Sequence, residues 1–277
     1  MTENTLTGLP DYERPPAIET LLGFYFEPLR GWRTPNFGLF WNEIRADYPD
    51  VDVQPTVSAN QEVKLELKSD ISRIQISGDI PVRWLYFNKS GKTLLQVQPE
   101  IFLQNWRKRD ASDPYLHYDE LLPSFMQMWL VFNKFLEGNG VEKPVIRECE
   151  VSYINHIDRG QGWQSLSDLG GVVTAWSGKT STGFLPSPGL VSLVTVYPMR
   201  GHQGQLQVSL QPGIRTSGQE TLQLALSARA KPKTQSMSDL RDTLNSAREW
   251  VVRGFDDITT DHMHEIWNRK PRGGDDQ

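Results

Sequence analysis

Hydrophobic residues recur with a helical period between Tyr118 and Leu136. The apolar positions lie on one stripe of a 3.6-residue helix, and they are Leu121, Leu122, Phe125, Met128, Trp129, Phe132, Phe135 and Leu136. Asp119 and Glu120 suit the positive end of the helix dipole, and Gly138-Asn139-Gly140 can end the helix. So many aromatic side chains on one stripe predict a buried core helix rather than a cofactor site.

The hydrophobic period changes to two after Pro144, which predicts a strand over residues 146–157. One face of this strand carries Cys149, Val151, Tyr153 and Ile157. The other face carries Glu148, Glu150, Ser152 and His156. We therefore expect the first face to pack in the core and the second to be wet or to line a polar groove.

Shorter patterns predict the remaining elements. Alternation predicts strands over residues 18–26, 63–67, 71–76, 82–87, 93–97, 190–197, 205–210 and 222–228. Ser90-Gly91 is typical of a hairpin turn between two of these strands. Helical spacing predicts helices over residues 37–48, 163–169, 240–255 and 263–267, with Ser236 and Thr260 as N-terminal caps of the last two.

The two halves of the chain share their order of elements. Pro16-Ala17-Ile18 and Pro144-Val145-Ile146 each open a strand, and a Gly-Trp pair follows each strand. This similarity predicts an α+β fold: an antiparallel sheet with long helices on one face, built from two pseudo-repeats of strand–helix–meander–helix. A single irregular α+β domain is the alternative.

The same pattern predicts four segments. Residues 1–14 are expected to be a flexible arm and residues 268–277 a disordered tail, because neither has an apolar period. Residues 15–140 form the first α+β half. Residues 141–267 form the second half, packed with the first as one unit.

Composition excludes several classes of protein. The net charge of −5 argues against a dedicated nucleic-acid binder, which needs a basic surface. Cys149 is the single cysteine, so there is no internal disulfide framework. The sequence has neither a membrane-spanning apolar run nor an N-terminal signal pattern. These observations predict a cytoplasmic protein without a membrane partner.

No coherent catalytic motif is present. The chain has no phosphate-binding G-x-x-x-x-G-K-[ST] loop, no dinucleotide-binding glycine pattern and no paired C-x-x-C. His262 and His264 are two residues apart, so on a helix they point to different sides and do not share a metal. Cys149 and His156 lie on opposite strand faces, which excludes a paired thiol nucleophile. We therefore assign no catalytic residue, metal or other cofactor.

Two polar clusters are candidate binding sites. In the first, Asn105, Trp106, Arg107 and Lys108, an indole beside cations suits a phosphate, a nucleotide or an acidic protein surface. The alternative is that Trp106 anchors a strand end in the core while Arg107 and Lys108 form salt bridges to acidic residues or are solvated. The second cluster is Glu148 and Glu150. These carboxylates could do acid–base work or bind a cation, but such pairs more often form salt bridges to a neighbouring strand.

Several motifs together resemble a known family. They are Pro15-Pro16-Ala17-Ile18-Glu19, Phe26-Glu27-Pro28-Leu29, Leu95-Gln96-Val97-Gln98, Asn105-Trp106-Arg107-Lys108, Ser152-Tyr153-Ile154-Asn155 and His264-Glu265-Ile266-Trp267. Over nearly the whole chain, these residues resemble a sporadically distributed, numbered family of uncharacterised bacterial proteins. The resemblance implies no established activity. The scattered distribution of the family suggests mobile or defence-associated genes.

These observations predict a non-catalytic binding or interaction protein, with a protein partner or self-association. The alternative is a nucleotide- or small-ligand-binding protein, or an enzyme, that uses Arg107 and Lys108 with the polar strand. That alternative requires the polar groups of Glu148, Glu150, Asn155 and His156 to meet in one concave pocket.

Overall fold

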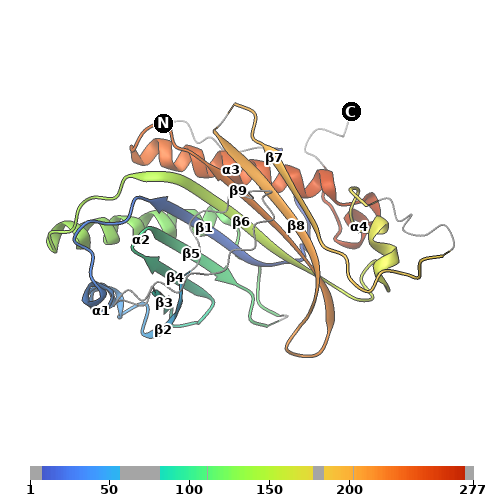
Figure 1. Ribbon diagram of the computed structural model, residues 1–277, viewed down its shortest axis with the longest axis horizontal. Coiled ribbons are helices and arrows are strands. Elements are labelled where there is room, and N and C mark those ends of the chain that lie inside the picture. Colours follow the sequence, from blue (N-terminus) through green and yellow to red (C-terminus); the bar gives the residue numbers. More distant parts are fainter. Residues whose placement is uncertain (1–7, 57–81, 111, 177–183, 202, 272–277) are drawn as a thin grey trace.

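The computed structural model describes residues 8–56, 82–110, 112–176, 184–201 and 203–271. It shows an α+β fold with one nine-stranded antiparallel sheet, in the order β2-β3-β4-β5-β1-β6-β9-β8-β7 (Figure 1). The strands are β1 (Ala17–Phe26), β2 (Asp50–Pro55), β3 (Val82–Phe87), β4 (Thr93–Gln98), β5 (Ile101–Arg107), β6 (Ile146–Asp158), β7 (Leu193–Pro198), β8 (Gly204–Ile214) and β9 (Glu220–Ala230). The helices are α1 (Thr34–Ile44), α2 (Tyr118–Gly138), α3 (Met237–Ile258) and α4 (Asp261–Ile266), with a 3₁₀ turn, η1, at Leu166–Gly171.

Strands β1 and β6 lie side by side at the centre of the sheet. Phe24 of β1 is opposite Cys149 of β6, and Cys149 is opposite Ala230 of β9. All three side chains are buried. The alternation is confirmed from Glu148 to Ile157, where odd-numbered residues face the core and even-numbered residues occupy the polar face. Ile146, beyond a register shift, is an even-numbered residue in the core.

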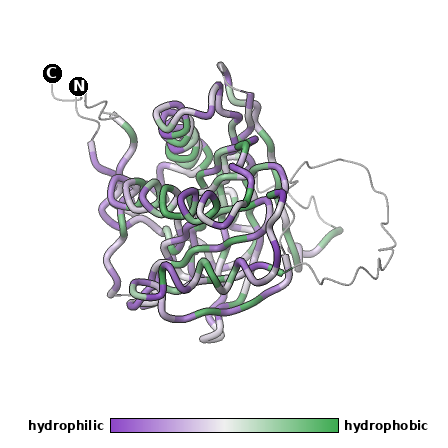
Figure 2. The backbone as a smooth tube through the Cα atoms, turned by 90° about the vertical axis from the view of Figure 1, so that its left-hand side faces the viewer, coloured by the Kyte–Doolittle hydropathy of each residue, from purple (hydrophilic) through white to green (hydrophobic). Residues whose placement is uncertain are grey.

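Helix α2 forms the largest part of that core, as its aromatic stripe predicts. The Trp129 ring lies 4.9 Å from Phe24 and 5.4 Å from Phe102, measured between centroids. Phe125 and Phe132 are fully buried beside it. In Figure 2, hydrophobic and hydrophilic residues alternate along the helices, as expected of helices with one buried stripe.

Helix α3 begins and packs as its sequence predicts. Asp239 N–H donates to Ser236 Oγ across 3.2 Å, which confirms the cap. Near the other end, a Cβ on Gly254 would lie 2.6 Å from Leu206 Cδ2 of β8. A side chain at this position would therefore require the Leu206 side chain to shift. None of the described helices is both long and apolar enough to cross a membrane.

Strand β2 differs from the sequence prediction, and two predicted strands cannot be compared with the structure. Strand β2 was not expected, because Asp50, Asp52 and Pro55 all disfavour strands. It forms nevertheless as an edge strand that pairs with β3. The strands predicted over residues 63–67 and 71–76 lie outside the described residues.

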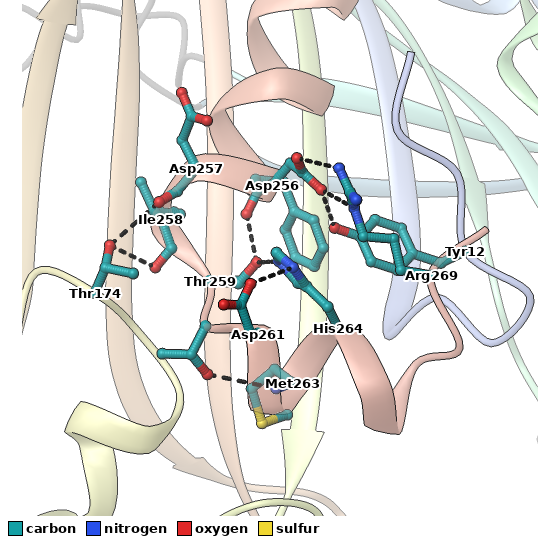
Figure 3. Close-up of polar contacts among 12 residues, drawn as sticks. Tyr12, Thr174, Asp256, Asp257, Ile258, Thr259, Asp261, Met263, His264 and Arg269 are labelled. Atoms are coloured by element: carbon teal, nitrogen blue, oxygen red, sulfur yellow. Dashed lines mark hydrogen bonds and ion pairs between the residues drawn. The ribbon is translucent and has the colours of Figure 1, made fainter. Parts of the chain in front are cut away.

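The first and last described segments of the chain meet beside α3. Tyr12 and Arg269 form an antiparallel bridge, and both hydrogen-bond to Asp256 of α3 (Figure 3). Lys270 forms an ion pair with Asp11. Parts of the segments expected to be an arm and a tail therefore contact the fold.

Candidate functional site

The ends of four strands meet at one end of the sheet. Arg107, the last residue of β5, is opposite Glu19 near the start of β1, which is opposite Ile154 of β6. Asp158, the last residue of β6, is opposite Thr221 near the start of β9. Because neighbouring strands run antiparallel, the end of one lies beside the start of the next. The segments that enter and leave these strands border one cleft of about 830 Å³.

Positive side chains dominate this cleft, which we call the basic cleft. Among the described residues, its cations are Arg14, Arg107, Lys108, Arg109 and Arg215. Two carboxylates, Asp110 and Asp158, also line it, so these residues carry a formal charge of about five minus two, or +3. The whole chain carries −5.

Most of this positive charge is not neutralised within the described part of the chain. Arg215 Nε lies 2.8 Å from Asp158 Oδ1. By contrast, Arg14, Arg107 and Lys108 form no close ion pair with any described residue. Arg107 does lie opposite Glu19, and its positive charge opposes the rise in the pKa of that carboxyl. These three cations are available to an external anion.

His156 lies in the same cleft. Its Nε2 is 3.4 Å from Gln223 Oε1, and its buried Nδ1 has no hydrogen-bond partner among the described residues. Burial, and then the positive charge of Arg215, lower the pKa of His156 below its ordinary value. The imidazole is therefore neutral at pH 7.

The structure divides the cluster of Asn105, Trp106, Arg107 and Lys108. Trp106 is only 2% exposed and packs edge-on against Tyr115, with 5.3 Å between ring centroids. The interpretation of Trp106 as an anchor in the core is therefore correct. Arg107 is exposed and lines the basic cleft with Lys108. Asn105 is buried on the opposite face from Trp106.

Asn105 belongs to a chain of polar side chains that crosses five strands. In order, the chain runs through Asp52, Gln54, Arg83, Gln96, Asn105 and Glu19. Arg83 donates to Gln54 across 2.8 Å and to Gln96 across 2.9 Å. Burial raises the pKa of Glu19, although the hydrogen bond from Asn105 opposes the shift. Each member hydrogen-bonds to the next, which explains how polar residues are tolerated on this face, although the buried Nε of Arg83 has no hydrogen-bond partner among the described residues.

Glu150 is held in a buried ion pair. Arg229 Nε donates to Glu150 Oε2 across 2.8 Å, and the hydroxyls of Ser152 and Ser227 donate to Glu150 Oε1 across 2.5 and 2.8 Å. The Arg229 guanidinium also lies 4.0 Å from the Tyr25 ring centroid. Burial alone would raise the pKa of Glu150, but the charge of Arg229 and these hydrogen bonds outweigh it and lower the pKa.

Glu148 reaches the same arginine from the rim. Its Oε2 lies 3.8 Å from Arg229 Nη1, and its side chain is 45% exposed. Both carboxylates therefore form salt bridges to a neighbouring strand, which is the more common role of such a pair. The arginine could not be anticipated from the spacing of Glu148 and Glu150, because it belongs to β9.

Asn155 faces the core and a second, smaller pocket. Its Nδ2 donates to the Leu224 carbonyl across 3.0 Å. It lines a pocket of about 280 Å³ with Tyr115, Tyr118 and Tyr153. The Arg248 guanidinium lies over the Tyr118 ring in this pocket, 4.6 Å from its centroid.

The four residues required by the catalytic alternative therefore do not converge. Glu148 and Glu150 are engaged by Arg229, His156 lies in the basic cleft, and Asn155 lies on the opposite face. The thiol of Cys149 is fully buried, and burial raises its pKa far above neutrality. Within the described residues, no group of three or more His, Cys, Asp or Glu side chains is placed to hold a metal ion.

Comparison with known proteins adds no further constraint. No protein-family model matches the chain, and no curated protein matches it.

Proposed function

We propose that this protein is a non-catalytic binding protein that holds an acidic segment of a protein partner in the basic cleft. The observation that carries the proposal is the convergence of Arg14, Arg107 and Lys108 without a close ion pair among the described residues. Cations without a close ion pair repel one another, so their concentration in an acidic chain favours a role in recognition.

The chemistry of the walls favours a peptide over a small phosphate compound. The exposed side chain of Ile214 and the partly exposed side chain of Ile266 add apolar surface to the cations. Arginine forks suit carboxylates, and the apolar wall suits the side chains that separate acidic residues in a peptide. An enzyme is less well supported, because the acid–base candidates are engaged or dispersed.

The cleft is tested with a labelled peptide of alternating glutamate and leucine, read by fluorescence anisotropy. We expect R107A/K108A to weaken binding by at least about tenfold, which corresponds to roughly 1.4 kcal/mol. The matched control is R30A/K134A, which removes two exposed cations from the surface hollow beside the end of α2. Both double variants should keep the melting temperature of the wild type.

Two results would overturn the proposal. One is equal loss of peptide binding in the control and the cleft variant, which would show non-specific charge attraction. The other is displacement of the peptide by stoichiometric inorganic pyrophosphate, which would assign the cleft to a small phosphate-bearing ligand.

We also propose that the two halves are pseudo-repeats with their long helices on one face of the sheet. The support is the strand order: β1-β5-β4-β3 on one side of the centre corresponds to β6-β9-β8-β7 on the other. Each set is followed by a long helix, α2 or α3. The same proposal includes membership of the bacterial family that the motifs resemble, a cytoplasmic location and a mobile or defence-associated setting. Co-purification of a partner from the native host tests the proposed interaction.

A further inference from the structure

Strand β7 forms one edge of the sheet and has an unusual composition. Among the described strands it pairs with β8 alone. Residues 180–199, which include the whole strand, contain no Asp, Glu, Lys, Arg or His. In a chain with 23% charged residues, a chargeless segment of this length is typical of buried structure.

Several side chains in the described part of this segment, residues 184–199, are nevertheless exposed. The side chains of Leu190, Val194 and Val196 are 72%, 52% and 40% exposed. Val194 is opposite Ser209 and Val196 is opposite Gln207 in β8, so both valines lie on the polar face of the sheet. An uncharged apolar edge strand offers unpaired backbone groups to another strand.

The opposite edge of the sheet is protected. Strand β2 carries Asp50 and Asp52, and Pro55 lacks a backbone donor. Charges and proline are the devices with which proteins prevent edge pairing. In β7 the only such residue is Pro198, at the end of the strand. The contrast indicates that pairing is blocked at β2 and permitted at β7.

We infer that β7 pairs antiparallel with β7 of a second copy of this chain, about a two-fold axis through Thr195. A two-fold interface places each residue opposite its symmetry-related position, so any charge close to the axis would meet a like charge. The sequence Leu193-Val194-Thr195-Val196-Tyr197 avoids this conflict. It places Thr195 opposite Thr195, Val194 opposite Val196 and Leu193 opposite Tyr197.

The pairing joins two sheets into one continuous sheet across the dimer. Threonine pairs and pairs of β-branched or aromatic residues are favourable neighbours across antiparallel strands. The inference is independent of the basic cleft, because no residue of β7 lines that cleft.

Sedimentation velocity across the micromolar range tests the inference. We expect a wild-type dimer whose dissociation constant rises at least about tenfold in V194K/V196K, because lysines would then face one another across the axis. V53K is the matched control, since Val53 is 46% exposed in the protected edge strand β2. It should remain dimeric. A wild type that stays monomeric, or a dimer that V194K/V196K leaves intact, overturns the inference.

Cysteine crosslinking tests the register without disturbing the strand. In the inferred pairing, two Thr195 Cα atoms lie about 4.5–5.5 Å apart, within the roughly 4.4–6.8 Å that a disulfide spans. T195C should therefore form a disulfide-linked dimer under mild oxidation. V194C should crosslink poorly, because the two copies lie on a diagonal of about 7–8 Å. Cys149 is fully buried and does not compete. Equal crosslinking of T195C, V194C and V53C would contradict the two-fold register.

Discussion

Tyr12 and Arg269, from opposite ends of the chain, form an antiparallel bridge and share one acceptor. The Tyr12 hydroxyl donates to Asp256 Oδ1 across 2.8 Å, and Arg269 donates to both carboxylate oxygens across 2.6 and 2.8 Å. Asp256 is buried in α3. The terminal segments are therefore fastened to the same helix by a charged group that needs its partners.

Removal of the Arg269 side chain is expected to destabilise the fold. R269A leaves the buried Asp256 carboxylate without its charged donor, which costs about 1.5–3 kcal/mol for hydrogen bonds to a charged group. Urea denaturation with the midpoint as readout measures the loss. K270A is the control, because the Lys270–Asp11 pair is solvent-exposed and should leave the midpoint unchanged. Equal midpoints for R269A and K270A would show that the bridge carries no stability.

The contribution of Asp256 should depend on pH. Burial raises its pKa, but hydrogen bonds from Arg269 and Tyr12 outweigh burial and lower the pKa below its ordinary range. A lowered folded-state pKa adds stability above the unfolded value of about 3.9, and this stability is lost as the pH falls through the folded value. The stability gap between wild type and D256N should stay constant from neutral pH to about pH 5 and shrink below about pH 4. Urea titrations at several pH values measure it, and an undiminished gap at low pH would contradict the assignment.

Trp129 should be among the most costly residues to remove. Its indole is enclosed by Phe24, Phe26 and Phe102. W129A is expected to lower the free energy of unfolding by about 3–5 kcal/mol, the usual cost of deleting a buried large aromatic side chain. L130A, at an exposed neighbouring position on the same helix, should have little effect. A small change in W129A would show that the core can collapse around the cavity.

Glu150 and Glu148 should differ sharply in their contributions. E150A leaves Arg229 buried without its closest carboxylate and should cost about 3–5 kcal/mol, as for one partner of a buried ion pair. E148A removes a distant, half-exposed contact and should cost less than about 1 kcal/mol. Chemical denaturation of the two variants decides the point. Comparable losses would mean that the two carboxylates share the arginine equally.

His156 should report on the charge of the basic cleft. Burial and Arg215 lower its pKa, so its proton NMR titration midpoint is expected below the ordinary value of about 6.5. R215Q removes a positive charge that disfavours protonation of His156 and should raise the midpoint toward that value. R30Q, which replaces a cation outside the cleft, should leave it unchanged. A midpoint insensitive to R215Q would show that burial alone sets the protonation of His156.

The elements that the sequence predicts correctly are those with a strong local pattern. The stripe of α2 and the alternation of β6 follow from residue spacing alone, because burial on one side imposes the period. The caps at Ser236 and Thr260 are equally local. Strand β2 breaks its own propensities with Asp50 and Pro55, and it forms because β3 offers a partner that residue spacing cannot indicate.

The candidate sites depend on the order of strands in the sheet, which residue spacing along the sequence does not indicate. Arg229 binds Glu150 because β9 pairs with β6. Arg215 and Arg107 line the same cleft because strand ends from both halves of the chain border it. Asn155 is a different case. Its odd number places it on the core face of β6, so the alternation itself indicates that it cannot join Glu150 and His156.

The central position of β1 and β6 also constrains how the chain can fold. Ala17–Phe26 leaves the ribosome well before its partner Ile146–Asp158, because four strands and two helices of the described chain lie between them in the sequence. During synthesis, one edge of β1 is unpaired while β3, β4 and β5 assemble on its other side. The entropy cost of closing this long loop must be met before the β1–β6 contacts stabilise the fold. Folding is therefore slower, and that edge of β1 stays exposed for longer. We therefore expect the N-terminal half, synthesised alone, to aggregate through β1, and to be rescued when the second half is supplied in trans.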